Sequence, residues 1–329
     1  MKSQRQAIVM VGSMNLDLTA VTDQLPGPGQ TVAASELACH PGGKSANQAA
    51  AAALLGGQVA MVGAVGQDHW GQLLLAAAGR CGVDTAAVKT VPGCASGMAL
   101  ITVDRQGENS IVVAAGANAQ LTPTDLPADR LAQAALVSLA LEVPMPTVVA
   151  AAALARAGGA TVVLNPSPWT ALPRELLQNT DVLVLNAHEL AAMSGLPDQA
   201  AAAGPAGLSV AAADALKDAG VASVVVTLGA DGVLLVTPGV SSRHVAPLVV
   251  PVVDTTGCGD AFTGALVAAL AKGAPIEAAA QLGAAAGAYA AGGRGAQPSY
   301  PSASQLSEFL VRHGLPDLLG EWWGPASSV

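Results

Sequence analysis

The chain has 329 residues, of which 52% are hydrophobic and 11% charged, and 14 Lys and Arg against 23 Asp and Glu give a formal net charge of −9. This composition excludes disorder over most of the chain, because disordered segments combine low hydrophobicity with high charge. The acidic balance argues against a nucleic-acid partner, because such partners are bound by basic residues that neutralise phosphates.

Short β-branched runs alternate with alanine-rich stretches along most of the chain. The runs predict buried strands at residues 7–11, 59–65, 135–141, 161–165, 182–186 and 223–228. The stretches between them predict helices at residues 46–55, 71–81, 146–157 and 210–219. This alternation predicts an α/β fold, with a mostly parallel sheet and helices on both of its faces. Such sheets bind ligands at the carboxyl ends of their strands.

Two segments break the alternation and predict a small second sheet. One is a hairpin with strands at residues 97–103 and 109–114, and the other is extended chain over residues 16–40 around a Pro/Gly turn. Further along, Asp231-Gly232 predicts a hairpin turn and residues 248–253 predict one more β run. The residues after Gly314 look like an appended tail.

The sequence predicts neither a membrane span nor a secretion signal. The longest uncharged run, residues 45–67, is interrupted by polar residues and glycines, whereas a spanning helix needs about 20 predominantly apolar residues. The apolar run near the N-terminus is too short for a secretion signal. The four cysteines (Cys39, Cys81, Cys94 and Cys258) show no CxxC spacing, which favours a reduced, cytoplasmic protein without structural zinc.

The most informative motif is the sequence DTTGCGD at residues 254–260, directly before a helical stretch. Helix N-termini bind anions through free N–H groups and a partial positive charge. Gly257 and Gly259 allow a phosphate to approach the backbone closely. A carboxylate is out of place beside a phosphate unless it handles the proton of the incoming nucleophile, so Asp260 is a candidate base. The alternative is that Asp260 only complements the helix dipole.

A second motif, HPGGKSANQ at residues 40–48, ends like a Walker A loop. A P-loop needs a glycine five residues before its final glycine, and Ala38 stands there, so the P-loop interpretation fails. The remaining interpretation is a diglycine turn entering a helix, with Lys44 and Asn47 on one side and able to bind a polyhydroxylated ligand. The alternative is that both side chains are merely exposed.

Weaker polar clusters follow other predicted strands. Asn15 and Asp17 follow the first strand and point to the same face of extended chain. Glu142, the 186–189 stretch and the 227–232 stretch end three further strands. Taken singly, such residues are more often turn formers than ligands. Their shared place at strand ends nevertheless predicts a common ligand site.

Cys258 lies between two glycines at the predicted helix N-terminus. That environment favours the reactive thiolate, whereas the charge of Asp260 opposes it. We therefore expect modest reactivity that bound nucleotide suppresses. The alternative is a buried thiol that no reagent reaches.

In order along the chain from about Val9 to Ser299, these motifs resemble the PfkB or ribokinase-like family of carbohydrate kinases. The resemblance is carried by the segments GSMNLD, PGGKSANQAAAAALLG, SGMALITVDRQGENSIVVAAGAN, LEVP, LNPSPW, NAHE, TLGADGV, DTTGCGDAF and RGAQPS. The hairpin that ends in AGAN favours the ribokinase branch of the family. The resemblance implies a doubly wound α/β kinase domain over residues 1–314, a β-sheet lid from about 16–40 and 96–115, and a tail at 315–329.

The resemblance also implies an activity. It implies transfer of a phosphoryl group from ATP to the 5-hydroxyl of D-ribose, with Mg²⁺ required and K⁺ activating, in a cytoplasmic homodimer joined through the lid. The implied partners are a small sugar and ATP, without nucleic acid or membrane. The alternatives are a kinase of 2-deoxyribose, a ketohexose or a nucleoside, and a catalytically silent sugar-binding protein. The intact 257–260 segment argues against a silent protein.

Residue by residue, the resemblance implies four sets of roles. Asp260 is the base, and the amides of Gly257, Cys258 and Gly259 form the anion hole. The sugar-contacting positions are Asn15, Asp17, Gly43, Lys44, Asn47, Glu142 and Asp260. The nucleotide-site positions are Asn186, Glu189, Thr227, Gly229, Gly232 and Gly259, with Glu189 linked to Mg²⁺ and phosphate. The monovalent-cation positions, largely backbone carbonyls, are Asp254, Thr256, Ala290, Gly293, Gly295 and Ser299.

Overall fold

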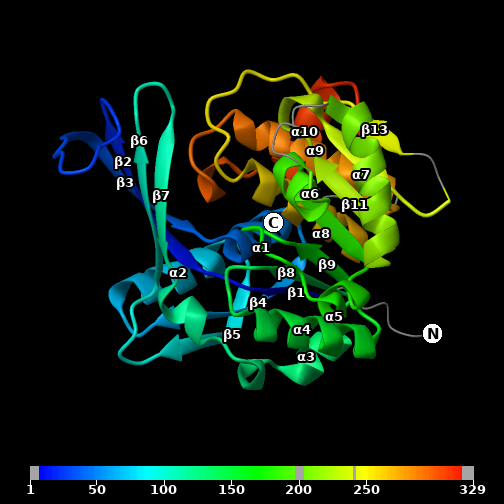
Figure 1. The fold of residues 1–329 in the computed structure, drawn as a ribbon, viewed down its shortest axis with the longest axis horizontal. Helices are drawn as coiled ribbons and strands as arrows, with labels where there is room; N and C mark the ends of the chain where they lie inside the picture. Colours follow the sequence, from blue (N-terminus) through cyan, green and yellow to red (C-terminus); the bar gives the residue numbers. More distant parts are fainter. Residues whose placement is uncertain (1–6, 197–203, 240–241, 321–329) are drawn as a thin grey trace.

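A nine-stranded sheet forms the centre of the protein in the computed structural model, which describes residues 7–196, 204–239 and 242–320 (Figure 1). Its strand order is β13-β12-β11-β10-β9-β8-β1-β4-β5. The strands from β11 to β5 are parallel, β12 is antiparallel to β11, and β13 is antiparallel to β12. The strands are β1 (Ala7–Val11), β4 (Gln58–Gly66), β5 (Asp84–Val91), β8 (Leu136–Ala140), β9 (Thr161–Asn165), β10 (Val182–Asn186), β11 (Ser223–Thr227), β12 (Val233–Val236) and β13 (Arg243–Val245).

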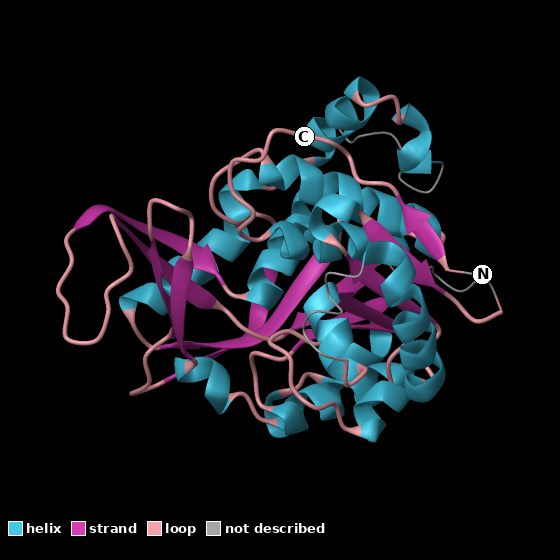
Figure 2. Ribbon diagram, turned by 45° about the horizontal axis from the view of Figure 1, so that its top comes forward, coloured by secondary structure: helices cyan, strands magenta, loops and turns pink. Residues whose placement is uncertain are grey.

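Helices cover both faces of this sheet (Figure 2). One face carries α1 (Lys44–Leu54), α2 (His69–Arg80), α8 (Cys258–Ala271), α9 (Ile276–Ala291) and α10 (Ala303–Arg312). The other carries α3 (Ala128–Gln133), α4 (Met145–Gly158), α5 (Arg174–Gln178), α6 (Ala187–Met193) and α7 (Gly204–Ala219). Along β1, Ile8 and Met10 enter the first core, and Val9 and Val11 enter the second. A strand covered on both faces must be apolar at successive positions, which confirms the fold class predicted from the β-branched runs.

A four-stranded sheet stands beside the main body and is the predicted lid (Figure 1). Its order is β3-β2-β6-β7, with a parallel central pair and antiparallel outer pairs. The strands are β2 (Asn15–Thr22), β3 (Ala34–Gly42), β6 (Gly97–Val103) and β7 (Asn109–Ala114). Because β2 begins four residues after β1 ends, the lid grows out of the carboxyl edge of the main sheet.

The predicted β run at residues 248–253 is wrong. The structure describes residues 246–257 in full, and they form no strand. Pro247 and Pro251 have no N–H group to donate to a sheet ladder, and this outweighs the β-propensity of the valines. Val249 and Val252 are exposed along this extended segment.

The first part of the predicted tail packs on the body. A short 3₁₀ helix (Pro316–Leu319) places Leu318 and Leu319 against the core beneath α9 and α10. The remaining tail, 321–329, lies outside the described residues. No helix within the described part of the chain is long and apolar enough to cross a membrane.

The winding of the main sheet reverses at β1. The chain continues from β1 to β4 and β5 on one side, and to β8 through β11 on the other. Ligands of doubly wound sheets bind at this switch point, outside the carboxyl ends of the strands. The residues that follow β1 and β8 there include Ser13 and Glu142, and their side chains are hydrogen-bonded to each other.

Gly264 lets α8 pack against α1 at short range. A Cβ atom on Gly264 would lie 2.6 Å from the carbonyl oxygen of Gln48 and 2.6 Å from the Cβ of Ala51. Atoms do not approach so closely, so a larger residue would push the two helices apart. We expect Gly264→Ala to be destabilising, because overpacking costs about 1–3 kcal/mol and the gain in helix propensity is about 1 kcal/mol.

Thermal unfolding checks this prediction, with Gly79→Ala as the matched control. Gly79 also lies inside a helix, and its Cβ would meet no described atom within 4 Å beyond that helix and its chain neighbours. We expect the control to keep or raise the melting temperature and Gly264→Ala to lower it by several degrees. Equal melting temperatures for the two variants would contradict the close-packing argument.

Candidate active site

Asp260 is held by two amide side chains from the neighbouring helix. Helix α8 begins at Cys258, which makes Asp260 the third residue of its first turn. The Asn47 Nδ2 group donates to Asp260 Oδ2 at 3.0 Å. The Gln48 Nε2 group donates to Asp260 Oδ1 at 3.2 Å. Each carboxylate oxygen therefore has an N–H donor, and the plane of the carboxylate is fixed.

The surroundings of Asp260 favour uptake of a proton. Part of the side chain stays open to solvent, but close-packed protein atoms desolvate the carboxylate. This desolvation raises the pKa of Asp260 above its usual value, although the charge of Lys44 and the hydrogen bonds from Asn47 and Gln48 oppose the rise. The group is thus a better proton acceptor than a carboxylate in water.

Two further carboxylates, those of Asp17 and Glu142, lie near Asp260. Burial raises the pKa of Asp17 to about 7. The charges of Glu142 and Asp260 add to this increase, and the ammonium of Lys44 opposes it. At neutral pH the Asp17 carboxyl is therefore partly protonated, so it can donate to or accept from a hydroxyl group.

Glu142 and Asn15 are locked in place by polar groups around the switch point. Glu142 Oε2 accepts from the Ser13 hydroxyl and, at 3.1 Å, from the backbone N–H of Lys44. The Asn15 Oδ1 atom accepts from Asn118 Nδ2 at 2.7 Å. Asn118 is the last residue of the AGAN segment, but the sequence analysis gave its side chain no role. Its contact with Asn15 is formed by the fold and is not visible in the sequence.

The diglycine turn allows these side chains to come together. A Cβ on Gly42 would lie 2.0 Å from Asp17 Oδ2, so the carboxylate occupies the space that any larger residue would need. Gly43 has φ 88°, and a Cβ there would lie 2.7 Å from the backbone nitrogen of Asn15. The two glycines are therefore required by the close approach of β2 to the start of α1.

The predicted nucleotide residues gather at the ends of β10 and β11. Asn186 and Thr227 are directly paired in the sheet register. Asn186 and Glu189 form a capping box at the start of α6, with reciprocal hydrogen bonds of 2.8 and 2.9 Å. Gly229 and Gly232 lie in the turn that joins β11 to the antiparallel β12, as the predicted hairpin requires. The capping box is a structural use of Glu189 that sequence reasoning did not foresee.

The predicted cation residue Asp254 is anchored across its loop. Asp254 Oδ1 accepts from the N–H and the hydroxyl of Thr256, at 2.9 and 2.7 Å, and Oδ2 accepts from the N–H of Gly295 at 2.8 Å. Burial disfavours the charged form, but these hydrogen bonds outweigh it and lower the pKa of Asp254. The carboxylate is therefore charged and joins residues 41 positions apart.

The surroundings of Cys258 correct one expectation. Burial, followed by the charges of Asp254 and Asp260, raises the pKa of the thiol to about 11. The environment therefore disfavours the thiolate, because desolvation and two carboxylates act against it.

The backbone N–H of Cys258 donates to the carbonyl of Thr255 at 3.2 Å. Of the three predicted anion-hole amides, this one already has an acceptor inside the protein.

Gly257 has the left-handed conformation that starts α8, with φ 75°. Its carbonyl accepts from the Tyr300 hydroxyl at 3.1 Å, and a Cβ on Gly257 would lie 2.6 Å from that hydroxyl. A side chain at this position would be strained and would collide with Tyr300. The glycine is therefore needed to place the first turn of the helix.

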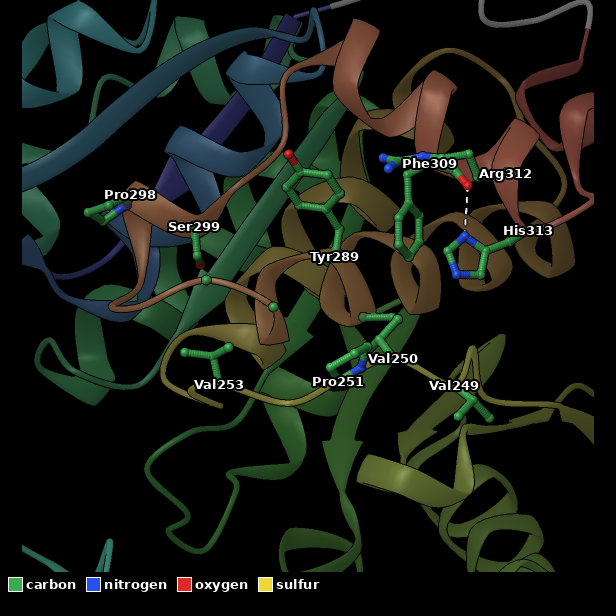
Figure 3. A pocket seen from close by; sticks show the side chains of 13 residues that line it. Val249, Val250, Pro251, Val253, Tyr289, Pro298, Ser299, Phe309, Arg312 and His313 are labelled. Carbon is green, nitrogen blue, oxygen red and sulfur yellow. Dashed lines mark hydrogen bonds between the residues drawn. The ribbon is translucent and has the colours of Figure 1, made fainter. Parts of the chain in front are cut away.

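A hollow of about 520 Å³ lies behind the predicted cation loop (Figure 3). Its walls come from the 249–253 segment, from Tyr289 of α9 and from Phe309 of α10, and Gly293 and Ser299 border it. None of the predicted sugar or nucleotide residues lines it. The hollow is thus separate from the carboxylate cluster around Asp260.

The protein is thus of the doubly wound α/β class, with a cluster of polar side chains at the carboxyl edge of its sheet. Residues 5–303 match the pfkB family of carbohydrate kinases, and the chain belongs to that family. This confirms the resemblance drawn from the sequence motifs.

Within this family, the chain is similar in sequence and structure to several sugar kinases. The chain is 36% identical over 310 residues to a ribokinase of Haemophilus influenzae, covering 93% of this chain and 99% of the relative. It is 35% identical over 310 residues to a deoxyribokinase of Salmonella typhi, covering 92% and 98%. The solved structure of Arabidopsis thaliana ribokinase complexed with ribose and ATP has a TM-score of 0.85 and 32% identity, covering 94% of this chain and 99% of that one.

Proposed function

We propose that the protein phosphorylates D-ribose at its 5-hydroxyl with ATP as the donor. The observation that carries the proposal is the Asp260 carboxylate, which two side-chain amides hold at a helix N-terminus. Beside it lie Asn15, Asp17 and Glu142, polar side chains of the kind that bind sugar hydroxyls. The Haemophilus influenzae ribokinase and the ribose and ATP complex of the Arabidopsis enzyme support this choice of substrates.

In the proposed reaction the sugar hydroxyl lies between Asp260 and the γ-phosphorus of ATP. The hydroxyl oxygen forms a bond to phosphorus, the bond to the β-phosphate oxygen breaks, and ADP leaves. The hydroxyl proton passes to the Asp260 carboxylate. Because the transition state of phosphoryl transfer is loose, orientation of the hydroxyl is the larger contribution of Asp260, and proton transfer can be late.

The start of α8 would stabilise the charge on the transferred group. In this proposal the anion is bound by the amides of Gly257, Cys258 and Gly259, because the start of a helix has free N–H groups and a partial positive charge. A phosphate that uses the Cys258 amide competes with its existing bond to Thr255. Gly257 and Gly259 are therefore the main donors in this proposal.

The sugar would be bound by side chains that the structure has already gathered. Its hydroxyls would contact Asn15, Asp17 and Glu142 on one side, and the Gly43 backbone, Lys44 and Asn47 on the other. The Asp17 carboxyl, with its pKa of about 7, can adapt its proton to the hydroxyl that it meets.

The nucleotide would occupy the ends of β10 and β11, beside Asn186 and Thr227 and over the Gly229 and Gly232 turn. Mg²⁺ takes oxygen ligands and is usually held by one or two carboxylates together with substrate phosphates. The buried Glu189 carboxylate fits that donor set, and it would act there while still capping α6. The metal would supply charge neutralisation of the phosphates.

Potassium would bind in the loop around Asp254. In this proposal the cation is bound mainly by backbone carbonyl oxygens, which suit K⁺. A Cβ on Gly293 would lie 2.7 Å from the Ser299 Cβ, and Gly295 is tied to Asp254, so this loop is folded tightly on itself. The full proposed set is Asp254, Thr256, Ala290, Gly293, Gly295 and Ser299.

The lid would join two copies of the chain. Leu100 and Val112 are paired in the lid sheet, Leu37 lies on the same face, and all three are exposed. This apolar face is opposite to the one that carries Asp17.

We expect light scattering to show a dimer, and Val112→Lys to give monomers because a charge would be buried at the contact. A wild-type monomer would contradict the proposed contact.

The Asp260→Asn variant tests the proposed base. Its amide keeps the shape of the side chain but accepts a proton poorly, so we expect turnover with ribose to fall about 10²- to 10⁴-fold. Ribose binding, measured by calorimetry, should largely survive.

The same ADP-release assay separates ribose from 2-deoxyribose, which the similarity to the Salmonella typhi deoxyribokinase makes the second candidate. We expect the wild type to have the higher kcat/KM for ribose. Near-normal turnover of a folded Asp260→Asn protein would remove the base assignment, and a preference for 2-deoxyribose would change the substrate.

Titration of KCl against NaCl at constant ionic strength tests the cation loop. We expect several-fold faster turnover in KCl, because the smaller Na⁺ fits a ring of backbone carbonyls less well. Choline chloride serves as the control for ionic strength. Equal rates in the two salts would exclude K⁺ selectivity at this loop.

A further inference from the structure

The two amides that hold Asp260 are themselves held by other amide side chains. Gln297 Nε2 donates to Asn47 Oδ1 at 3.0 Å, while Asn47 Nδ2 donates to Asp260. On the other side, Gln48 Nε2 donates both to Asn165 Oδ1 at 3.1 Å and to Asp260. Two relays of side-chain amides therefore converge on one carboxylate, one at each of its oxygens.

Each relay fixes which end of an amide faces Asp260. An Asn or Gln side chain can present either an oxygen or an NH₂ group, and only the NH₂ group can donate to a carboxylate. In the first relay the Gln297 donor engages the oxygen of Asn47, so the NH₂ group is left for Asp260. In the second, Asn165 donates to the carbonyl of Val184 at 2.9 Å, which turns its oxygen toward Gln48.

The burial of the relay makes these orientations costly to lose. Asn47 is 5% exposed and Gln48 is 1% exposed. Water has little access to replace a missing donor there, so an amide that loses its partner is free to turn or is left unsatisfied. The orientation of the carboxylate therefore depends on residues that do not touch it.

From this geometry we infer that Gln297 and Asn165 are positioning residues for the reaction, acting on Asp260 through Asn47 and Gln48 respectively. The inference rests on the proposed function, because it assumes that Asp260 faces the reacting hydroxyl. Gln297 is the first residue of a short 3₁₀ helix (Gln297–Ser299), and Asn165 ends β9. The first relay thus connects the base to the loop that carries the proposed cation positions, and the second connects it to the main sheet.

The test replaces the donor without changing the shape. Gln297→Met has a similar length and no N–H group, so it removes the hydrogen bond to Asn47 and preserves packing. We expect kcat to fall about tenfold or more, because misorientation of a catalytic group by a fraction of an ångström is costly. The KM for ATP should stay within about twofold. Gln178→Met, at an exposed position on α5, is the control and should leave both constants unchanged.

A double-mutant cycle separates positioning from general stability. The Asn47→Ala background lacks the side chain that links Gln297 to Asp260, so Gln297→Met should cause little further loss of kcat there. A merely structural role for Gln297 would lower kcat by the same factor in both backgrounds, and would lower the melting temperature of both proteins. Additive effects would therefore overturn the inference for the first relay.

The second relay is tested in the same way, with Asn165→Leu and a Gln48→Met background. Assays use the sugar that the wild type phosphorylates fastest, so a change of sugar leaves the test intact. If the wild type is active and the Gln297→Met and Asn165→Leu variants keep its kcat, the inference is overturned and the proposed function stands. A wild type inactive with every sugar would overturn the proposed function, and the inference with it.

Discussion

The close contact between α1 and α8 is the constraint on which the site depends. Asn47 and Gln48 come from one helix and Asp260 from the other, and their hydrogen bonds exist only if the helix axes lie close together. Alanine and glycine make up most of this contact, with Gly264 against the backbone of Gln48. The small residues that dominate the composition therefore have a functional consequence, because bulkier side chains would separate the donors from the carboxylate.

The close packing of this site also brings acidic side chains near one another, and their repulsion changes their pKa values. Asp17 and Asp260 are both affected by the charges of Glu142 and Lys44, and the attraction of the Lys44 ammonium opposes the repulsion from the neighbouring carboxylates. Burial and mutual repulsion raise the pKa of both aspartates, and hydrogen-bond donors hold the acids in position. A ligand rich in hydroxyl groups would relieve this arrangement, since hydroxyls donate to carboxylates without adding charge.

The sequence predicted the body of the fold well because both faces of the main sheet are buried. Three predicted strands, 7–11, 161–165 and 182–186, match the structure residue for residue, as do both strands of the lid hairpin. It failed at 248–253, where valines favoured a strand but prolines removed the donors. The sequence singled out Asp260 from its motif, yet it gave no role to Gln297, which contacts Asn47 across 250 positions of the chain. Contacts of this kind depend on tertiary packing, and a local pattern carries no information about them.

The relays also explain why the two signature segments of the chain belong together. The diglycine segment supplies the amides and the 254–260 segment supplies the carboxylate, so neither forms the site alone. A third segment, around Gln297, completes the arrangement and is tied through Gly295 to Asp254, which stands six residues before the carboxylate. Two routes thus lead from one loop to the Asp260 carboxylate: along the backbone through the start of α8, and through the hydrogen bonds of Asn47. A change in that loop would act on the start of α8 and on the Asp260 carboxylate together, and in the proposed reaction it would alter turnover without contacting the sugar.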